Sequence, residues 1–429
     1  MNHFEARNGD LYCEDVALEE IARRVGTPVY VYSTATLERH YLAVADAVSG
    51  EPALNGALIA FAVKANSNLA VLATLARCGA GADTVSEGEI RRALAAGIPA
   101  DRVIFSGVGK SEAEITFAIS RGVRQINVES APELHLISRV AQALGRRPDI
   151  AIRVNPDIGA GGHAKITTGA RESKFGVSLR EAARLYAEAA ADPNLRMRGL
   201  ACHIGSQITN LTPLGAAYHR LADLTRDLRA GGLCVDRLDL GGGLGAPYFN
   251  SPDPPEPAEL VKLAAAAVAG LDVEVAFEPG RVIAANAGVL LATTLHVNAR
   301  PDGRRFMVLD AGMNDLMRPA LYDSFHDIRP LAPRSGRAVS YDVVGPVCET
   351  TDTFARARTL PPLQAGDRVA FMTAGAYGAV MASEYNSRPL APEVLVRGSE
   401  WAVIRPRPSH DDLLARDRLP PWMAKAGSG

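Results

Sequence analysis

The stretch ALIAFAVKAN (57–66) opens a run of eight short apolar segments, and helical patterns alternate with them along the chain. Strands that alternate with helices in this way are typical of a closed barrel of eight parallel strands with an outer ring of helices. The other segments are GADTV (81–85), RVIFSG (102–107), QINVES (125–130), IAIRVN (150–155), RGLACHIGS (198–206), RLDLGGG (237–243) and VEVAFEPGR (273–281). The sequence therefore predicts an α/β fold with a (β/α)₈ TIM barrel.

The barrel takes up the middle of the chain. Residues 36–281 match the length of about 250 residues that a complete barrel needs. Beyond residue 281 the pattern changes to β-rich runs without long helices between them, such as GVLLATTLHVNA (288–299), DRVAFMTAG (367–375) and PEVLVRG (392–398). We therefore expect a second, all-β domain of the sandwich or barrel-like type, made of residues 282–429 and of residues 1–35, whose TPVYVYS (27–33) reads as a strand.

The bulk composition favours a small-molecule enzyme of the cytoplasm. Lys and Arg total 46 against 48 Asp and Glu, so no strong field recruits nucleic acid or an anionic membrane. The N-terminus lacks the basic-then-apolar layout of a signal peptide, and no uncharged run approaches the roughly 18 residues of a membrane span. The five cysteines are widely spaced, so we expect no metal site and no disulfide framework.

A long connection follows the fifth segment. Residues 156–178 are polar and rich in glycine, which is unusual for a barrel loop. Because this loop starts at the carboxyl end of a strand, we expect a lid over the active site, with a disordered segment as the alternative.

Lysine is rare in this chain, which makes its position informative. Only six lysines accompany forty arginines, so arginine supplies most of the positive charge. Lys64 ends the first apolar run, and we expect it to point into the barrel mouth, where burial would lower its pKa and make the amine a Schiff-base nucleophile. A strand-end lysine that merely extends to solvent is the alternative, and Lys110 is the only comparable rival.

A glycine-rich turn follows the seventh segment, in LDLGGGLGAP (238–247). It satisfies the GxGxxA pattern of dinucleotide sites, but Pro247 and polar residues stand where the helix of that motif should begin. In barrels, the loops after strands seven and eight commonly bind phosphate, because bare backbone amides can approach the anion. We therefore expect a phosphate cradle, completed by EPGR (278–281), with a simple tight turn as the alternative.

A lysine amine, a phosphate cradle and a carboxylate in one barrel mouth predict pyridoxal 5'-phosphate as the cofactor. Lys64 would hold it covalently, the glycines would bind its phosphate, and Glu278 would keep the pyridine nitrogen protonated. His203, at the end of the sixth segment, would stack on the ring. A core histidine with satisfied hydrogen bonds is the alternative for His203.

With these residues the chain resembles the barrel-type, fold-type III PLP-dependent decarboxylases, and within them most closely the diaminopimelate decarboxylase family, over nearly its whole length. The resemblance rests on FAVKAN (61–66), VSEGEIRRALAAGI (85–98), FSGVGKSEAEI (105–115), NVES (127–130), CHIGSQ (202–207), LDLGGGLG (238–245), EPGR (278–281), MNDLMRPALYDSFHDI (313–328), VVGPVCETTD (343–352) and GAYGAVMASEYNSRP (375–389). The last four strings together are highly specific. The resemblance implies decarboxylation of meso-2,6-diaminopimelate to L-lysine and CO₂, the last step of lysine biosynthesis.

The resemblance also implies roles for individual residues. Lys64, Cys348 and His203 would be catalytic, with Cys348 protonating the carbanion. The cofactor would be bound by Lys64, Asp83, His203, Ser206, Gly242, Gly243, Glu278, Gly280, Arg281 and Tyr377. The substrate would be bound by Arg281, Arg318, Tyr322, Glu349 and Tyr377. Cys348 and Glu349 would come from the second subunit of a homodimer with shared active sites.

The chemistry of the substrate agrees with this assignment. Diaminopimelate carries a carboxylate and an ammonium group at each end, so its distal end needs a guanidinium group and an anion, which Arg318 and Glu349 can provide. An ornithine, arginine or carboxynorspermidine decarboxylase on the same fold is the nearest alternative, but a basic-ended substrate has no use for Arg318. A catalytically inactive PLP-binding regulatory homologue is the alternative from another class, and it should lack Lys64 or the Cys348 segment.

Overall fold

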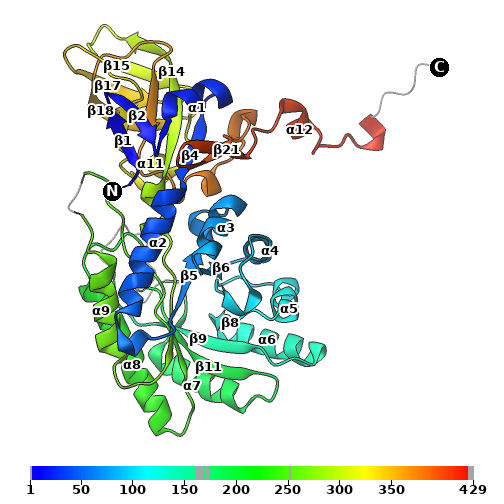
Figure 1. The fold of residues 1–429 in the computed structure, drawn as a ribbon. Helices are drawn as coiled ribbons and strands as arrows, with labels where there is room; N and C mark the ends of the chain where they lie inside the picture. Colours follow the sequence, from blue (N-terminus) through cyan, green and yellow to red (C-terminus); the bar gives the residue numbers. More distant parts are fainter. Residues whose placement is uncertain (1, 160–168, 170–172, 251–252, 424–429) are drawn as a thin grey trace.

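The computed structural model describes residues 2–159, 169, 173–250 and 253–423. Eight parallel strands close into a barrel in its lower half (Figure 1). Each of the eight predicted segments overlaps one of these strands. They are β5 (Leu58–Ala62), β6 (Gly81–Thr84), β7 (Val103–Phe105), β8 (Gln125–Val128), β9 (Asp149–Asn155), β11 (Arg196–Ala201), β12 (Arg237–Asp239) and β13 (Glu274–Phe277), and β13 pairs with β5 to close the circle. The two-residue β10 (Val177–Ser178) extends β9 on the outside.

Helices cover the barrel. They are α3 (Leu69–Arg77), α4 (Glu87–Ala95), α5 (Glu112–Arg121), α6 (Ala131–Leu144), α7 (Leu179–Ala191), α8 (Thr212–Ala230) and α9 (Pro257–Val268). Several begin where a serine hydroxyl accepts a backbone N–H of the first turn, as Ser86, Ser111, Ser130 and Ser178 do. After β13 only the four-residue α10 (Arg281–Ala284) follows, and α2 (Thr34–Ser49) packs beside α9 and α3 in the eighth position. The ring of helices is therefore completed by a helix that precedes the first strand.

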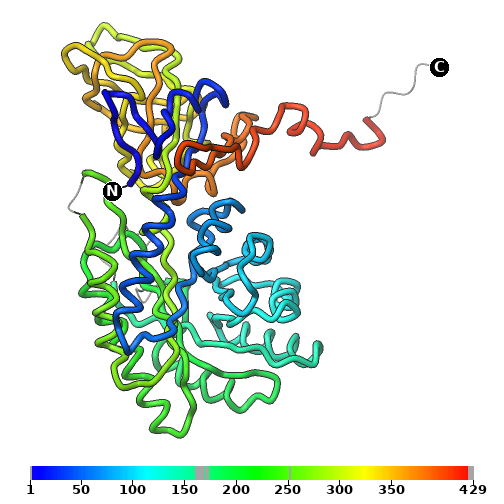
Figure 2. The backbone as a smooth tube through the Cα atoms, in the orientation of Figure 1, coloured from blue at the N-terminus to red at the C-terminus, as the bar shows by residue number. Residues whose placement is uncertain are grey.

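The upper half is rich in β structure, as predicted. One sheet has the order β18 (Thr353–Leu360), β17 (Val339–Val344), β15 (Arg305–Leu309), β14 (Gly288–Ala299), β4 (Val29–Ser33), β20 (Glu393–Arg397) and β21 (Glu400–Arg405), and β19 (Arg368–Phe371) with β16 (Ile328–Pro330) joins it at β14. The N-terminal strand β4 lies between β14 and β20, which confirms that the chain starts in the β region. Figure 2 shows the chain running from there into the barrel and back.

Smaller elements of this half were not predicted from the sequence. They are β1 (Phe4–Arg7), β2 (Asp10–Cys13), β3 (Val16–Ala17), α1 (Leu18–Val25), α11 (Arg318–Tyr322) and α12 (His410–Leu414). The predicted domain boundaries at residues 36 and 281 stay a prediction, because one buried cluster joins Phe61 and Ile152 of the barrel to Leu290 and Phe371 of the β region.

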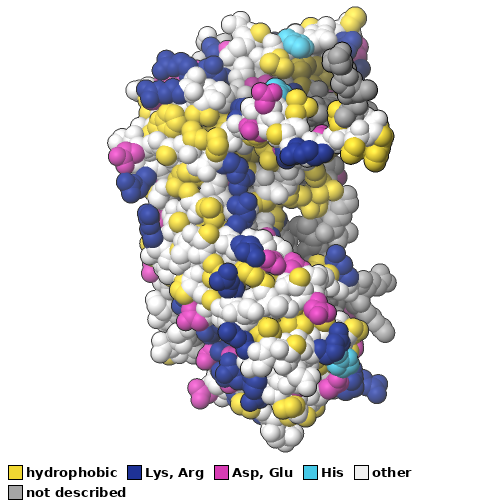
Figure 3. Space-filling model, turned by 90° about the vertical axis from the view of Figure 1, so that its right-hand side faces the viewer, with side chains coloured by type: hydrophobic (Ala, Val, Ile, Leu, Met, Phe, Trp, Pro, Cys, Tyr) yellow, Lys and Arg dark blue, Asp and Glu magenta, His cyan; other side chains and the backbone are white. Residues whose placement is uncertain are grey.

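The surface carries charge of both signs. On the face drawn in Figure 3, basic and acidic side chains are mixed with apolar ones over both halves. None of the helices in the described part of the chain is long and apolar enough to cross a membrane.

Candidate active site

A cavity of about 390 Å³ opens at the carboxyl ends of the barrel strands. Its lining includes Lys64, His203 and Glu278, which the sequence placed there, and also Ser106, Arg153, Phe175, Val85 and the loop of Gly107, Val108 and Gly109. A concave site with converging titratable groups at this end of a barrel is the expected position of an active site.

Lys64 lies in a short 3₁₀ turn (Val63–Ala65) directly after β5. Its Nζ donates a hydrogen bond of 2.8 Å to Oδ2 of Asp83, a fully buried carboxylate at the end of β6. Burial lowers the pKa of Lys64, but the carboxylates of Asp83 and Glu278 raise it by more, so that the net shift is upward. The expected low amine pKa is therefore wrong for this structure, because the predicted desolvation is outweighed by two anions.

Lys110, the alternative candidate for the cofactor lysine, forms hydrogen bonds to protein groups away from Lys64. Its Nζ donates to the carbonyl oxygens of Gly107 and Asn127 and to Glu133, at 2.6, 2.7 and 2.6 Å. Its side chain is only 1% exposed. An ammonium group has three N–H donors, so these three hydrogen bonds use all of them, and Lys110 has a structural role in the buried interior.

Glu278 follows β13 and sits in a buried polar network. Burial and the neighbouring carboxylate of Asp239 raise its pKa well above the usual value, and Asp239 is itself shifted upward, chiefly by burial. Asp239 accepts hydrogen bonds from Nδ2 of Asn127 and from the backbone of Gly241, and Ser106 donates weakly to Glu278 at 3.4 Å. Each of two neighbouring buried carboxyl groups disfavours ionisation of the other, so the pair favours keeping a proton. Sequence reasoning missed Asp239, although it stands only two positions before the first of the three glycines.

His203 follows β11 at the cavity wall. The backbone N–H of Gly242 donates to its Nδ1 at 3.1 Å, which fixes the neutral tautomer with the proton on Nε2. Burial, together with the positive charges of Lys64 and Arg153, holds the pKa of His203 well below 6.5. The ring is therefore uncharged at neutral pH.

The glycine turn is built so that no side chain fits. A Cβ on Gly242 would lie 2.1 Å from the carbonyl oxygen of Glu278, and one on Gly243, where φ is +121°, would lie 2.7 Å from that of Gly205. A Cβ on Gly280 would come within 3.1 Å of Ala62 and Ala65. The turn therefore packs against the backbone of neighbouring loops as only glycine allows, and the N–H of Gly242 is engaged by His203, so the phosphate cradle stays a prediction.

Two buried arginines stand beside this turn. Arg281 donates to Oγ of Ser206 at 3.1 Å and to the hydroxyl of Tyr248 at 2.7 Å. The guanidinium of Arg318 lies 4.8 Å from the ring centre of the same tyrosine, and that of Arg281 lies 4.7 Å from the ring centre of Tyr377. The structure thus places Ser206 and Tyr377 beside Arg281, and joins Arg281 to Arg318 through Tyr248, which the sequence gave no reason to single out.

Arg318 has a second partner that the sequence did not suggest. Its Nη1 donates to Nε2 of His326 at 3.0 Å, and Nδ1 of the same ring donates to the carbonyl oxygen of Met372 at 2.9 Å. His326 is 2% exposed, and burial with the adjacent Arg318 charge lowers its pKa to about 3. Tyr322, at the end of α11, is half-buried and close enough to Arg281 to influence its pKa.

Cys348 and Glu349 differ from the other predicted site residues in their exposure. Of the predicted set only Lys64, His203 and Glu278 line this cavity, and of those that do not, only Cys348 and Glu349 are exposed. Asn386 accepts the backbone N–H of Cys348 at 3.0 Å, and the hydroxyl of Tyr385 donates to Glu349 at 3.3 Å. Most of the predicted lid, residues 160–168 and 170–172 of the 156–178 connection, lies outside the described residues.

Comparison with known proteins fits this geometry. Residues 35–285 match the family model of the pyridoxal-binding domain of pyridoxal-dependent decarboxylases. The chain is 45% identical to a diaminopimelate decarboxylase of Zymomonas mobilis, over 98% of this chain and 99% of the relative. The chain belongs to the diaminopimelate decarboxylase family. A Vibrio cholerae member is 47% identical over 98% of this chain and 100% of its own length. The crystal structure of the Helicobacter pylori enzyme complexed with L-lysine matches with a TM-score of 0.89 and 40% identity, covering 93% of this chain and 98% of that one.

The cofactor of the family is pyridoxal phosphate, and the residues of this cavity fit it. Oδ1 of Asp83 is buried and has no hydrogen-bond partner within the part of the chain that the structure describes. Since buried polar atoms are normally hydrogen-bonded, this oxygen can accept a bond from a ligand. The glycine turn carries no side chain that could stand between its backbone and a phosphate group. The Glu278–Asp239 pair is where a protonated pyridine nitrogen gains most, since its positive charge would offset a buried anion.

Proposed function

We propose that this chain removes CO₂ from meso-2,6-diaminopimelate and releases L-lysine, with pyridoxal phosphate bound in the cavity at Lys64. Arg318 carries the argument. It is a buried guanidinium that forms no ion pair with a carboxylate among the described residues, and its neighbour His326 is neutral. A buried arginine of this kind favours an anionic ligand. Diaminopimelate has a distal carboxylate to offer, and ornithine and arginine have none.

Several residues in and around the cavity have a role in this reaction. Bound pyridoxal phosphate supplies an aldehyde for an amine and a ring that withdraws electrons from the α-carbon. Lys64 is the amine that attaches the cofactor, and Asp83 orients its Nζ through the 2.8 Å hydrogen bond. Glu278 and Asp239 hold the proton at the pyridine nitrogen. The uncharged ring of His203 covers one face of the cofactor without adding a competing charge.

The phosphate and the distal end of the substrate are bound by separate groups. The glycine turn at Gly242 and Gly243, with Ser206, Gly280 and Arg281, holds the phosphate, while the N–H of Gly242 stays with His203. Arg318 binds the distal carboxylate, with Tyr322 and Tyr377 beside it. The distal ammonium needs an anion as well. The carboxyl groups that the described residues place at this cavity are already engaged, Glu278 with Asp239 and Asp83 with Lys64.

That anion, we propose, is Glu349 of a partner subunit, so that a homodimer has two shared active sites. Cys348 and Glu349 are exposed on this chain and lie outside the lining of its own cavity. Cys348 of the partner would deliver the proton to the α-carbon. We place this small-molecule enzyme in the cytoplasm.

The activity is tested by incubating the PLP-loaded protein with meso-diaminopimelate and measuring CO₂ and L-lysine. Ornithine, arginine and carboxynorspermidine serve as competing substrates, and Lys64→Ala as the inactive control. Equal or faster turnover of a basic-ended substrate would replace the proposal by the alternative decarboxylase. Cofactor binding without any turnover would replace it by a regulatory protein.

Shared sites are tested by mixing two inactive variants, Lys64→Ala and Cys348→Ala, under conditions that exchange subunits. In a heterodimer both lesions fall in one site and the other stays intact. About a quarter of wild-type activity should return, because a statistical mixture is half heterodimer with one good site in each. No recovery in heterodimers confirmed by native mass spectrometry would mean that each site is built from one chain.

A further inference from the structure

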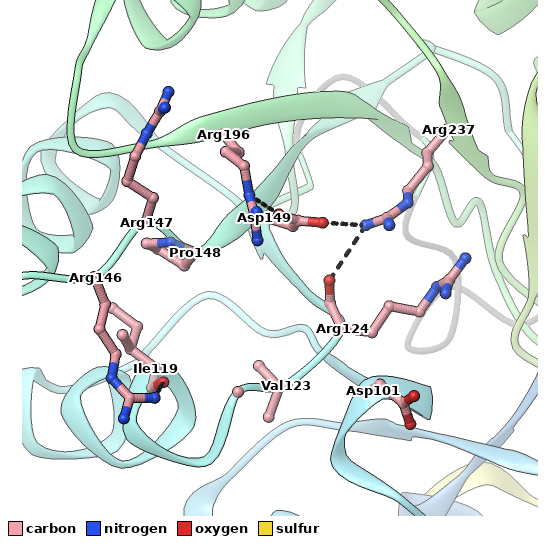
Figure 4. A pocket seen from close by; sticks show the side chains of 11 residues that line it. Asp101, Ile119, Val123, Arg124, Arg146, Arg147, Pro148, Asp149, Arg196 and Arg237 are labelled. Atoms are coloured by element: carbon pink, nitrogen blue, oxygen red, sulfur yellow. Dashed lines mark hydrogen bonds and ion pairs between the residues drawn. The ribbon is translucent and has the colours of Figure 1, made fainter.

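A second cavity lies at the opposite end of the barrel, where no part of the proposed reaction takes place. It has a volume of about 470 Å³ and is formed at the amino ends of β8, β9, β11 and β12. Figure 4 shows Arg196 and Arg237 reaching toward Asp149 from two sides, with Arg146 on the neighbouring wall and Ile119, Val123 and Pro148 between them. Volumes of this size accommodate small-molecule ligands.

The cavity and its rim carry more positive than negative charge. Arg196 and Arg237 share Asp149, at 2.5 and 2.9 Å. Arg237 also shares Glu274 with Arg124 and Arg198. The basic groups are Arg124, Arg146, Arg147, Arg196, Arg198 and Arg237, and the acidic groups of the described residues around them are Asp101, Asp149, Asp236 and Glu274, which leaves an excess of two positive charges.

Two of these arginines have no carboxylate partner in the described chain. Arg146 donates to the carbonyl oxygens of Ile119 and Ser120 at 3.4 and 3.2 Å, and Arg147 donates to that of Leu195 at 2.8 Å. Carbonyl groups satisfy an N–H donor but do not neutralise a charge. The pKa of Arg124 is lowered, first by burial and second by the neighbouring Arg237 guanidinium.

The arginines also keep unused donors. Arg196 uses only its Nε on Asp149, and Arg146 uses only Nη1, so Nη groups of both remain for a ligand. Paired N–H groups of arginine match the oxygens of phosphate and carboxylate groups. We propose that this cavity binds a small molecule with at least two negative charges on phosphate or carboxylate groups, held by Arg146, Arg196 and Arg237 above the apolar floor of Ile119 and Val123.

The test is calorimetric titration of the PLP-loaded enzyme with pyrophosphate and, separately, with citrate, at constant ionic strength adjusted with sodium chloride. Each probe should bind saturably at one site per chain. Arg146→Ala and Arg196→Ala should each weaken binding at least about tenfold, because each removes a charge-assisted partner. Arg180→Ala, which changes an exposed arginine on α7, should bind as the wild type does.

The relative affinities identify the ligand chemistry. Tighter binding of pyrophosphate assigns a phosphorylated ligand, and tighter binding of citrate assigns a polycarboxylate. Arg146→Ala should keep the wild-type cofactor absorbance and decarboxylase activity without a probe, which shows that its fold is intact. Absence of saturable binding for both probes, or unchanged affinity in both pocket variants, would overturn the proposal.

Discussion

Replacing His326 with glutamine should remove part of the acid sensitivity of the protein. The ring is held neutral because it donates to Met372 and accepts from Arg318, and its pKa is lowered to about 3. In the unfolded chain a histidine has a pKa of about 6.5. Below that pH the unfolded state therefore binds a proton at His326, whereas the folded state does not until the pH approaches 3. Stability is therefore complete above pH 6.5 and is lost progressively as the pH falls toward 3.

The size of the effect follows from the two pKa values. At pH 5 the unfolded ring is almost fully protonated and the folded ring is not, which costs about 2 kcal/mol of unfolding free energy relative to pH 8. Glutamine can make the same two hydrogen bonds and does not titrate. Between pH 8 and pH 5 the free energy of unfolding of His326→Gln should therefore fall by about 2 kcal/mol less than that of the wild type. Urea titrations at the two pH values resolve this difference.

His296→Gln provides the matched control, because His296 is exposed on β14. It should lose as much stability as the wild type between pH 8 and pH 5. Equal losses in wild type and His326→Gln would refute the reasoning, since they would mean that His326 is protonated in the folded protein. Arg318 would then face a cation, and its role in binding a carboxylate would need another explanation.

Two further substitutions probe the substrate and cofactor sites. Arg318→Met should lower kcat/KM for diaminopimelate by an amount equivalent to roughly 2 to 5 kcal/mol while PLP content stays full, because it leaves the distal carboxylate unpaired; an unchanged kcat/KM would remove Arg318 from the distal pocket. Gly242→Ala should weaken cofactor binding strongly, since its Cβ would collide with the carbonyl oxygen of Glu278 at 2.1 Å, and equilibrium dialysis showing wild-type PLP affinity would contradict the cradle.

The barrel could be predicted because its strands are buried on both faces. β5 is the clearest case, since all five of its residues, LIAFA, are buried and the sequence reads as one apolar run. β18 was missed for the opposite reason. Its sequence TFARARTL faces solvent along much of its length and shows no apolar run. The eighth helix could not be placed from the local pattern either, because α2 reaches its position only through closure of the ring.

The active site was predictable where chemistry is local and not where it depends on distant contacts. Lys64 and Glu278 stand at strand ends, so their convergence follows from the barrel itself. The upward shift of the Lys64 pKa depends on Asp83, 19 positions away, and the sequence does not reveal that distance in space. The contacts of Arg318 with Tyr248 and His326 could not be predicted from the sequence, because they depend on how the barrel packs against the β region.

The central claim is that Lys64, in the cavity at the carboxyl ends of the strands, is the amine that carries the cofactor. Borohydride reduction of the PLP-loaded enzyme, followed by proteolysis and mass spectrometry, measures this directly. We expect the pyridoxyl group on the peptide that contains Lys64, and no labelling in Lys64→Ala. A pyridoxyl group on Lys110 would contradict the account, because that amine would first have to leave Gly107, Asn127 and Glu133.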